Sequence, residues 1–356
     1  MHASSDFKRS IRLWKLSSCS TVYTATRIPV SWLVIMELVM NHNHAVLGIL
    51  LLLLVLAFLA RSYLAARPRY FLPIAGKIGL VIIVLAEVLL YLQAHWVTIY
   101  FTPVVWTGAV MLMDSLVFTV QGASLLQSKP ARFFALALWS VPLWLIFEAY
   151  NLWLKNWAYV GLPHSRLLSD MGYLWSFATI WPAIFETADF LTATGAIRKT
   201  SQPHRAAHGL TRVGCLMLGA CFLVLPVMIA PQAGDYLFGM VWIGFALLLD
   251  PLNYRMGGHS LLRDWESGNL QTLYSFLASG MICGVLWEFW NYWAHARWIY
   301  IFPIFQNWKI FEMPAPGFLG FPPFAVECFV MFEFLSTVYD RCVPHSGNSA
   351  EEWRRK

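Results

Sequence analysis

Long apolar runs alternate with short polar connections along most of the chain. Ala45–Ala60 is apolar throughout, and Gly79–Leu92 is interrupted only by Glu87. A helix needs about 20 apolar residues to cross the hydrocarbon core of a bilayer, and these runs approach that length. The pattern predicts an all-α polytopic membrane protein with about nine transmembrane helices. The predicted spans are 45–65, 74–94, 101–121, 133–153, 171–192, 210–230, 236–254, 271–293 and 317–338.

The composition excludes an ordinary soluble enzyme. Hydrophobic residues make up 58% of the 356 residues, charged residues only 12%, and the mean hydropathy is +0.57. Soluble domains carry about 25% charged residues. The pI near 9.0 does not indicate a nucleic-acid partner, because the basic residues lie in short loops between apolar runs.

The Lys and Arg residues predict the orientation. From residue 40 onward, sixteen of them fall in the loops after predicted helices one, three, five and seven and in the C-terminal tail. The opposite side carries four: Lys155, Arg166, Arg297 and Lys309. Because positive charge is enriched on the cytoplasmic side, we expect a cell-membrane protein whose C-terminus is cytoplasmic.

The span pattern divides the chain into six segments. Residues 1–39 carry five basic residues that this topology would place outside, so we expect a dispensable leader or an over-extended start; an amphipathic leader is the alternative. The other segments are a leading helix (40–73), a four-helix repeat (74–193), a cytoplasmic linker (194–209), a second four-helix repeat (210–338) and a cytoplasmic tail (339–356).

An internal duplication is the most informative feature of the sequence. Four motifs recur in the same order at offsets of 136 to 141 residues. An even number of helices per copy predicts two parallel repeats related by a pseudo-twofold axis along the membrane normal. The motifs are Trp-x-Gly-x5-Asp-x7-Gly-x-Ser-Leu-Leu from Trp106 and Trp242, Glu-x-x-Asn-x-Trp from Glu148 and Glu288, Trp-x-Tyr from Trp157 and Trp298, and Pro-x3-Glu from Pro182 and Pro323.

Three carboxyl groups inside predicted spans recur from one repeat to the other, and ionisable residues in a span are costly and point to function. The Asp and the Pro-linked Glu of each repeat are predicted to meet in the inner half of the bilayer, as a proton relay or as neutral acids hydrogen-bonded between helices. The prolines predict helix kinks whose freed carbonyls accept from these glutamates. The predicted relay residues are Asp114 and Asp250, and the predicted catalytic residues are Glu288, Glu327, Glu148 and Glu186.

The remaining repeated residues lie near the extracytoplasmic helix ends. Glu148 and Asn151 share one helix face, as do Glu288 and Asn291. Tryptophans are concentrated on the same side, which favours an aromatic pocket over an interfacial belt, because belts mark both faces. A head-group or substrate clamp is one interpretation of the polar residues, and an ion pair with Lys155 or Arg297 is the other. The predicted substrate-binding residues are Asn151, Trp153, Trp157, Tyr159, Asn291, Trp293, Trp298 and Tyr300.

A short pattern in the second repeat resembles that of small membrane-bound lycopene cyclases. It consists of Trp287-Glu288, Arg297-Trp298-x-Tyr300, Pro314 and a later Pro323-Phe324. Those enzymes also have tandem membrane repeats, and they carry a proline followed by paired glutamates where this chain has Pro314-Ala315-Pro316-Gly317. The resemblance covers about 40 residues of each repeat. It implies a membrane site for an isoprenoid or similar lipid, at which carboxyl groups give and take protons at an alkene.

These features favour a membrane-embedded enzyme acting on an isoprenoid or other lipid by acid–base chemistry, of the cyclase, isomerase or hydratase type. A proton-coupled transporter and a non-catalytic membrane scaffold are the alternatives. The expected partners are the bilayer and a hydrophobic small molecule or lipid. The sequence has no Walker loop, Asp-rich diphosphate motif or HExxH motif, so we expect no cofactor and no metal. It does not indicate an oligomeric state.

Overall fold

A computed structural model describes residues 30–204, 209–229, 231–234 and 236–342. The chain divides into two units, residues 1–43 and residues 44–356, and the second unit contains all of the predicted spans. Most of the predicted leader and most of the predicted C-terminal tail lie outside the described residues. Helix α2 (Val30–Ala66) begins upstream of the predicted first span.

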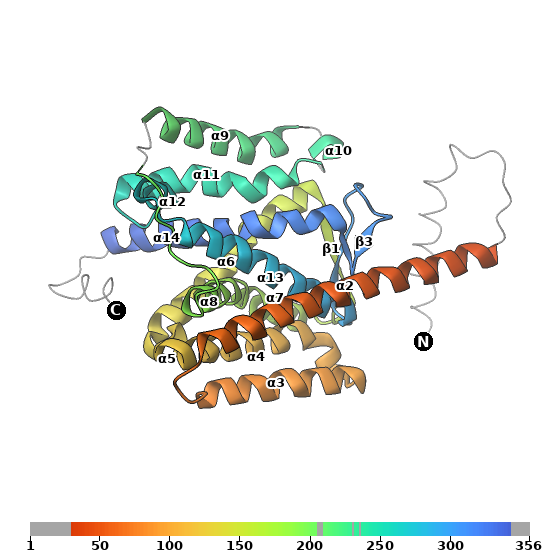
Figure 1. Ribbon diagram of the computed structural model, residues 1–356. Coiled ribbons are helices and arrows are strands. Elements are labelled where there is room, and N and C mark those ends of the chain that lie inside the picture. Colours follow the sequence, from red (N-terminus) through yellow and green to blue (C-terminus); the bar gives the residue numbers. More distant parts are fainter. Residues whose placement is uncertain (1–29, 205–208, 230, 235, 343–356) are drawn as a thin grey trace. The chain divides into compact units, whose positions relative to one another are not determined.

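Helices make up almost all of the described chain (Figure 1). The first part contains α3 (Ile74–Tyr91), α4 (His95–Gln121), α5 (Leu125–Ser128), α6 (Pro130–Leu154), α7 (Arg166–Ala178) and α8 (Ile180–Ala193). The second part contains α9 (Gly209–Met228), α10 (Pro231–Gly234), α11 (Phe238–Met256), α12 (Leu261–Ser267), α13 (Gln271–Trp293), the 3-10 helix η1 (Ala315–Gly320) and α14 (Phe321–Cys342). The four strands are β1 (Trp157–Val160), β2 (Arg297–Tyr300), β3 (Lys309–Ile310) and β4 (Met313–Pro314).

The protein is a multi-pass integral membrane protein. Among the described residues, seven helices are long and apolar enough to cross a bilayer. The predicted count of nine is larger because the spans 171–192 and 236–254 do not meet this criterion. The first is divided between α7 and the 14-residue α8, and the second, α11, includes the charged Asp250 and Arg255.

The break between α7 and α8 has a clear local cause. The chain turns at Thr179, and Ser140 of α6 bridges the two helices by donating to the Phe177 carbonyl and accepting from the Trp181 amide. Pro182 is the third residue of α8, a position where its missing N–H costs little. Pro323 is likewise the third residue of α14. Each predicted span is therefore interrupted next to its proline, as a break between two helices with the proline in the first turn of the second and not as a kink inside one helix.

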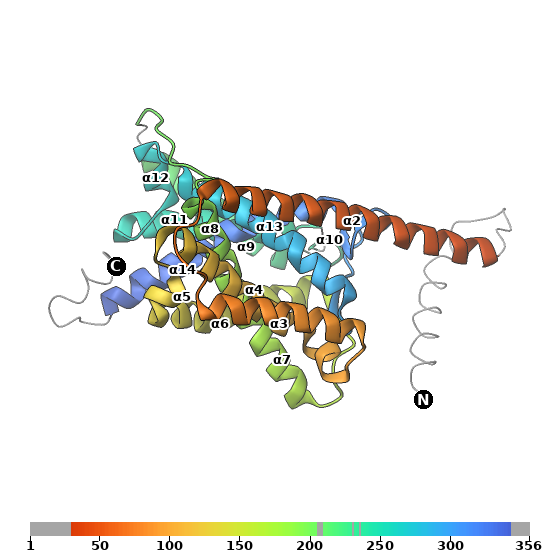
Figure 2. The same cartoon turned by 60° about the horizontal axis from the view of Figure 1, so that its bottom comes forward.

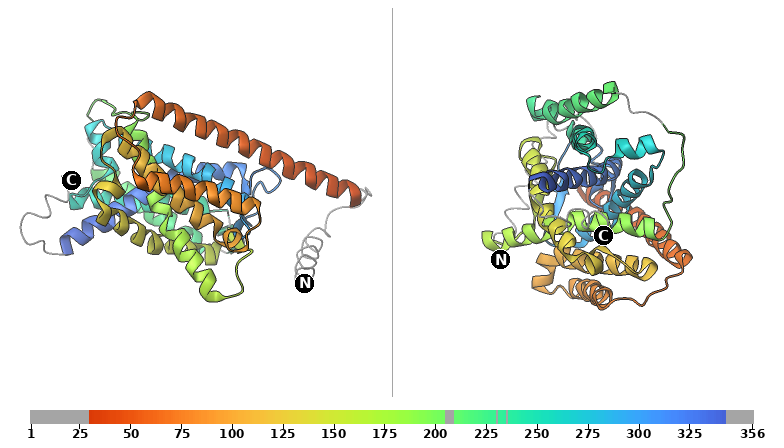
Figure 3. Two further views of the ribbon diagram at one scale, coloured as in Figure 1. Left: turned by 90° about the horizontal axis from the view of Figure 1, so that it is seen from below. Right: turned by 90° about the vertical axis from the view of Figure 1, so that its left-hand side faces the viewer.

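The long helices pack in a continuous order. α3 packs on α4, α4 on α8, α8 on α13, α13 on α14, α14 on α11 and α11 on α9. The right-hand view of Figure 3 shows the two ends of this order, with α9 (green) at the top and α3 (orange) at the bottom. Figure 2 shows α7 leaning out of the bundle, where it contacts α6 and α4.

The connections lie at two opposite ends of the bundle. At one end, β1 and β2 form an antiparallel ladder, which we call the strand end, and β3 pairs with β4 nearby. At the other end lie α5, α12 and the end of α14 (Figure 1). We call this the basic end, since the loops rich in Lys and Arg lie there, including Lys129 and Arg263.

Candidate functional site

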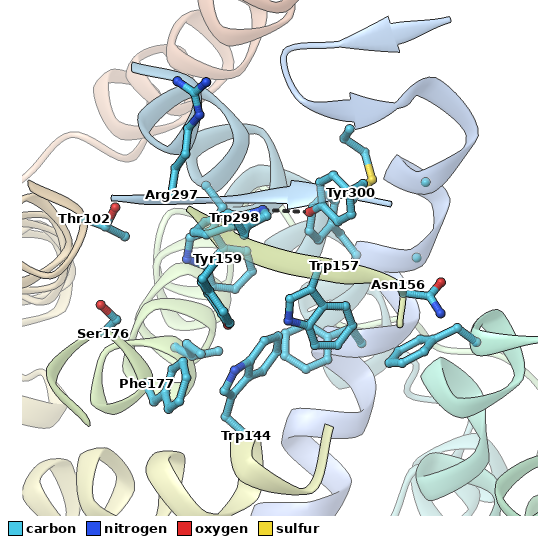
Figure 4. A pocket seen from close by; sticks show the side chains of 18 of the residues that line it. Thr102, Trp144, Asn156, Trp157, Tyr159, Ser176, Phe177, Arg297, Trp298 and Tyr300 are labelled. Atoms are coloured by element: carbon cyan, nitrogen blue, oxygen red, sulfur yellow. Dashed lines mark hydrogen bonds between the residues drawn. The ribbon is translucent and has the colours of Figure 1, made fainter. Parts of the chain in front are cut away.

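A cavity of about 490 Å³ lies beneath the β1–β2 ladder at the strand end. Its wall is formed by α4, α6, α7, the start of α8, α11, α13, η1 and α14, together with the two strands and their loops. We call it the aromatic cavity, because ring side chains dominate its lining (Figure 4). These rings include Trp106, Trp144, Trp157, Tyr159, Trp242, Trp287, Trp298, Tyr300 and Phe324.

The Glu148 carboxyl is bound by three aromatic side chains of the cavity wall. Its Oε1 accepts from the Nε1 of Trp144 at 2.8 Å, from the Nε1 of Trp157 at 3.2 Å and from the Tyr159 hydroxyl at 2.5 Å. Trp144 lies one helical turn before Glu148 on α6, and the other two come from β1. Glu148 therefore joins the end of α6 to the strand that follows it.

Glu288 has a matching environment on α13. Its Oε1 accepts from the Tyr300 hydroxyl at 2.7 Å and from the Nε1 of Trp298 at 3.3 Å, and that Nε1 also donates to the Tyr300 hydroxyl at 2.9 Å. Glu288 is fully buried, and its Oε2 has no hydrogen-bond partner among the described residues. Glu148 is only half-buried, so the two carboxyls differ in their access to solvent.

The side chains of Asn151 and Asn291 bind backbone groups of the strands and are not among the residues that line the aromatic cavity. Asn151 accepts from the backbone amides of Asn156 and Trp157 and donates to the Trp157 carbonyl. Asn291 likewise accepts from the Trp298 amide and donates to the Trp298 carbonyl. In both cases a side-chain amide on the last turns of a long helix satisfies backbone groups of the next strand, which fixes the position of the aromatic residue there.

The register of the ladder places the four repeated aromatic residues on one face. Trp157 pairs with Tyr300 and Tyr159 with Trp298, and cross-strand partners share a face. Arg297 alternates to the other face. Figure 4 shows the Arg297 side chain pointing away from the rings of Trp157 and Tyr159.

The two tyrosines keep their protons at neutral pH. Burial, reinforced by the neighbouring Glu148 carboxyl, raises the pKa of Tyr159 well above its usual range. Burial and the Glu288 carboxyl do the same to the pKa of Tyr300. Each hydroxyl is therefore a hydrogen-bond donor to a carboxyl group at the cavity wall.

The structure brings most of the predicted outer-site residues together, but not all. Trp157, Tyr159, Trp298 and Tyr300 line the aromatic cavity, whereas the two Glu and two Asn side chains lie behind them. Trp153 and Trp293 are not among the lining residues and are 49% and 47% exposed. Trp144 is the residue that sequence reasoning missed, although its position four residues before Glu148 was a usable signal.

The Pro-linked glutamates lie away from the aromatic cavity. Glu186 and Glu327 are both fully buried and are not among its lining residues. The predicted bonds to freed carbonyls are not found among the described residues: the Glu327 Oε1 accepts from the Phe245 amide at 2.8 Å, and the Glu186 oxygens have no well-formed hydrogen bond there. Glu186 does interact with Asp114, as predicted for the first repeat, but nothing equivalent links Glu327 to Asp250 within the described part of the chain.

Asp114 and Asp250 bind the loops that follow their helices. Asp114 accepts from the Ser124 hydroxyl at 2.9 Å and from the Leu126 amide at 2.7 Å. Asp250 accepts from the Ser260 hydroxyl at 2.9 Å and from the amides of Leu261 and Leu262. In both copies an Asp inside a long helix thus satisfies amides in the first turn of the short helix beyond it.

No family model, curated protein or solved structure matches the chain. Among the described residues, no group of three or more His, Cys, Asp or Glu side chains is arranged to hold a metal ion.

Proposed function

We propose that this protein is a membrane enzyme that acts on an isoprenoid or a similar lipid by acid–base chemistry in the aromatic cavity. One observation carries the proposal: two carboxyl–tyrosine pairs, Glu148–Tyr159 and Glu288–Tyr300, meet at the wall of one apolar cavity. The short resemblance to membrane-bound lycopene cyclases agrees with this class of substrate.

The size and lining of the cavity suit an apolar ligand. Ligand sites usually enclose about 300–1,000 Å³ and combine apolar walls with few polar groups. Here the polar groups of the wall include ring N–H and O–H groups that point at Glu148 and Glu288, a few hydroxyls and amides, and Arg297 at the strand end. Several tryptophan rings line the space, and the faces of aromatic rings attract positive charge. A carbocation formed on an alkene would be stabilised there.

The tyrosines connect the carboxyls to the ligand. Tyr300 gives its proton to an alkene carbon as Glu288 returns one to the hydroxyl, and Tyr159 removes a proton from a second carbon and passes it to Glu148. One C–H bond forms and one breaks, so the net reaction is an isomerisation or a cyclisation without a change in oxidation state. Glu288 suits the acid role, because it is the more deeply buried of the two carboxyls.

We further propose that the chain is built from two repeats and that its basic end faces the cytoplasm. Equivalent side chains make equivalent contacts in both halves, as Asn151 and Asn291 do with their strands and Asp114 and Asp250 with their loops. The positive-inside bias supports the orientation.

Deuterium incorporation tests the proposed chemistry without knowledge of the product. The purified protein in lipid nanodiscs would be incubated in D2O with a linear polyene such as lycopene or squalene, and the recovered hydrocarbon analysed by mass spectrometry. We expect deuterium in the polyene with the wild type and a loss of at least tenfold in Glu288→Gln and Glu148→Gln. Asp170→Asn, which changes an exposed carboxyl on α7, is the matched control. Absence of deuterium with every polyene, or full activity in Glu288→Gln, would contradict the proposal.

A proton-coupled transporter is the second candidate. A second cavity at the basic end favours it, because a transporter needs access from both ends. Movement of a labelled solute across proteoliposomes, driven by a pH gradient, would distinguish transport from catalysis.

A further inference from the structure

A second cavity, of about 430 Å³, opens among polar side chains at the basic end. We call it the polar cavity. Charged groups of both signs line it: Lys129 and Arg132 from the start of α6, Asp189 from α8, Glu333 from α14 and His259 from the loop after α11. Arg132 and Glu333 form an ion pair of 3.6 Å. The mixture of charges and hydroxyls makes this a space for water rather than for an apolar ligand.

The two cavities approach each other along two helices. On α8, Ile180 lines the aromatic cavity and Phe185 lines the polar cavity; on α14, Phe324 and Phe329 are placed in the same way. Five residues separate the members of each pair, which corresponds to a rise of about 7.5 Å. A wall of roughly one and a half helical turns therefore stands between the polar cavity and the aromatic cavity.

Glu186 lies at the polar-cavity edge of this wall. It follows Phe185, is fully buried, and has both carboxyl oxygens without a well-formed hydrogen bond among the described residues. The charged groups that act on it are Asp114 from α4 and Asp189 from its own helix. From α13, the uncharged Cys283 contacts the next residue of α8, with its Sγ 3.4 Å from the Thr187 hydroxyl. An ionised carboxylate in this place would have no cation to pair with among the described residues, so Glu186 carries a proton.

Asp189 connects Glu186 to the polar cavity. The two residues are three apart on α8 and so share a helix face. Asp189 is exposed, and the space it faces is the polar cavity, where Lys129 and Arg132 act on it. Asp114 of α4 interacts with Glu186 and accepts two hydrogen bonds from its loop, one of them from Ser124 at the polar cavity. Three neighbouring carboxyls thus lie beside the polar cavity.

We propose that Asp189, Glu186 and Asp114 form a proton-exchange path that opens only on the polar cavity. A proton from cavity water binds the Asp189 carboxylate, moves to Glu186 and is shared there with Asp114; no other bond forms or breaks. The path does not depend on the acid–base chemistry of the aromatic cavity, and each can be disproved without the other.

The second half of the chain lacks this path. With the offset of 141 residues, Glu327 corresponds to Glu186 and Val330 corresponds to Asp189. Valine cannot relay a proton, and the Glu327 Oε1 already accepts from the Phe245 amide. Glu327 is therefore a buried carboxyl of similar depth that is cut off from the polar cavity, which makes it the matched control.

Infrared spectroscopy of the full chain in nanodiscs tests the path, because a protonated carboxyl has its own C=O band and the band shifts when the proton is replaced by deuterium. Subtracting the spectrum of Glu186→Gln isolates Glu186, and subtracting that of Glu327→Gln isolates Glu327. After a change from H2O to D2O we expect the Glu186 band to shift at least tenfold faster than the Glu327 band. Asp189→Asn should slow the Glu186 shift at least tenfold.

Blocking each cavity tests the direction of access. Ser128→Cys places a thiol in the polar cavity and Ser176→Cys places one in the aromatic cavity, and both would be modified with a bulky charged thiol reagent. Modification of Ser128→Cys should slow deuterium uptake by Glu186, whereas modification of Ser176→Cys should not. Three results would each overturn the proposal. The first is that Glu186→Gln removes no protonated carboxyl band, and the second is that Glu186 and Glu327 exchange at equal rates. The third is that modification of Ser176→Cys slows deuterium uptake by Glu186. Unchanged thermal unfolding of each variant would show that folding is intact.

Discussion

Trp157 lies directly opposite Tyr300 across the β1–β2 ladder, and Tyr159 lies directly opposite Trp298. In the predicted repeat, Trp157 corresponds to Trp298 and Tyr159 to Tyr300. Exchange of the two copies therefore turns the first pair into the second, which is the register that a twofold relation requires. A shift of one residue would send the rings to opposite faces, so the register itself is needed to bring both carboxyl–tyrosine pairs to one cavity.

The first prediction concerns the asparagines that hold this register. Asn151→Ala removes the partner of two backbone amides and one carbonyl. A buried polar group left unsatisfied costs about 1–3 kcal/mol, so we expect a clear fall in the thermal unfolding midpoint and weaker binding in the aromatic cavity. Asn151→Asp keeps the acceptor and should lose less stability than Asn151→Ala. Equal stability of wild type and Asn151→Ala would contradict this role.

The second prediction separates the tryptophans of the outer motifs. Trp298→Phe removes the indole N–H that donates to Glu288 and to Tyr300, so ligand binding or turnover should fall at least tenfold. Trp293→Phe should leave both unchanged within twofold, because Trp293 is half exposed and does not line the cavity. The measurement is polyene binding and deuterium incorporation for the two variants side by side. A larger loss for Trp293→Phe would reverse the assignment.

The membrane character of the fold was predictable from the sequence, because apolar length alone specifies most spans. The exact place of the break at Thr179 was not, since hydropathy is continuous across it and Pro182 predicts only an interruption nearby. A tertiary contact decides it, namely the Ser140 hydroxyl that bridges the two helix ends. A hydropathy pattern carries no information about such a partner, which lies about 40 residues away in the chain.

The site could be predicted in part for a similar reason. The spacing of Glu148 and Asn151 correctly put both at one helix end next to a Trp-x-Tyr segment. The sequence did not show that Asn151 binds backbone groups or that Tyr159 stands between Glu148 and the cavity. The depth of Asp114 along its helix also did not predict its hydrogen-bond partners, because these come from the loop that follows the helix and folds back onto it.

The third prediction concerns the loops that the aspartates bind. Asp250→Ala leaves two backbone amides and the Ser260 hydroxyl without an acceptor, so we expect a large loss of stability. Ser260→Ala removes a single hydrogen bond, worth about 0.5–1.5 kcal/mol, and should destabilise less. Chemical unfolding in detergent, monitored by tryptophan fluorescence, would show which of the two variants loses more stability. Greater damage from Ser260→Ala would show that the serine has another role.

The fourth prediction concerns glycines at matching helix crossings. A Cβ on Gly79 of α3 would lie 2.5 Å from the Gly108 carbonyl oxygen of α4, and a Cβ on Gly219 of α9 would lie 2.5 Å from the Leu248 amide nitrogen of α11. Backbone atoms cannot yield as side chains do. Gly79→Ala and Gly219→Ala should therefore separate the paired helices and lower the unfolding midpoint.

Gly214 on the same helix α9 is the matched control. A Cβ there meets nothing within 4 Å, and alanine is favoured over glycine inside a helix by about 0.5–1 kcal/mol. Gly214→Ala should thus leave stability unchanged or raise it. If Gly214→Ala and Gly219→Ala had the same effect, close packing would not be the reason for glycine at position 219.

The last prediction is a pH dependence at the polar cavity. The His259 Nε2 lies 3.0 Å from an Asp264 carboxyl oxygen, and this hydrogen bond raises the pKa of His259 above its ordinary 6.5. The protonated imidazole is therefore favoured in the folded state. Its contribution to stability is present in full below pH 6.5 and is lost as the pH rises through the higher folded pKa. The thermal unfolding midpoint of the wild type should exceed that of His259→Gln at low pH and approach it above this window. Asp264→Asn should reduce the pH dependence of the difference, because it removes the largest of the contributions that favour the imidazolium; Glu333 and Asp250 supply the others. A difference between wild type and His259→Gln that stays constant from about pH 6 to pH 9 would show that His259 acts through its contact with the Phe329 ring instead of through its charge.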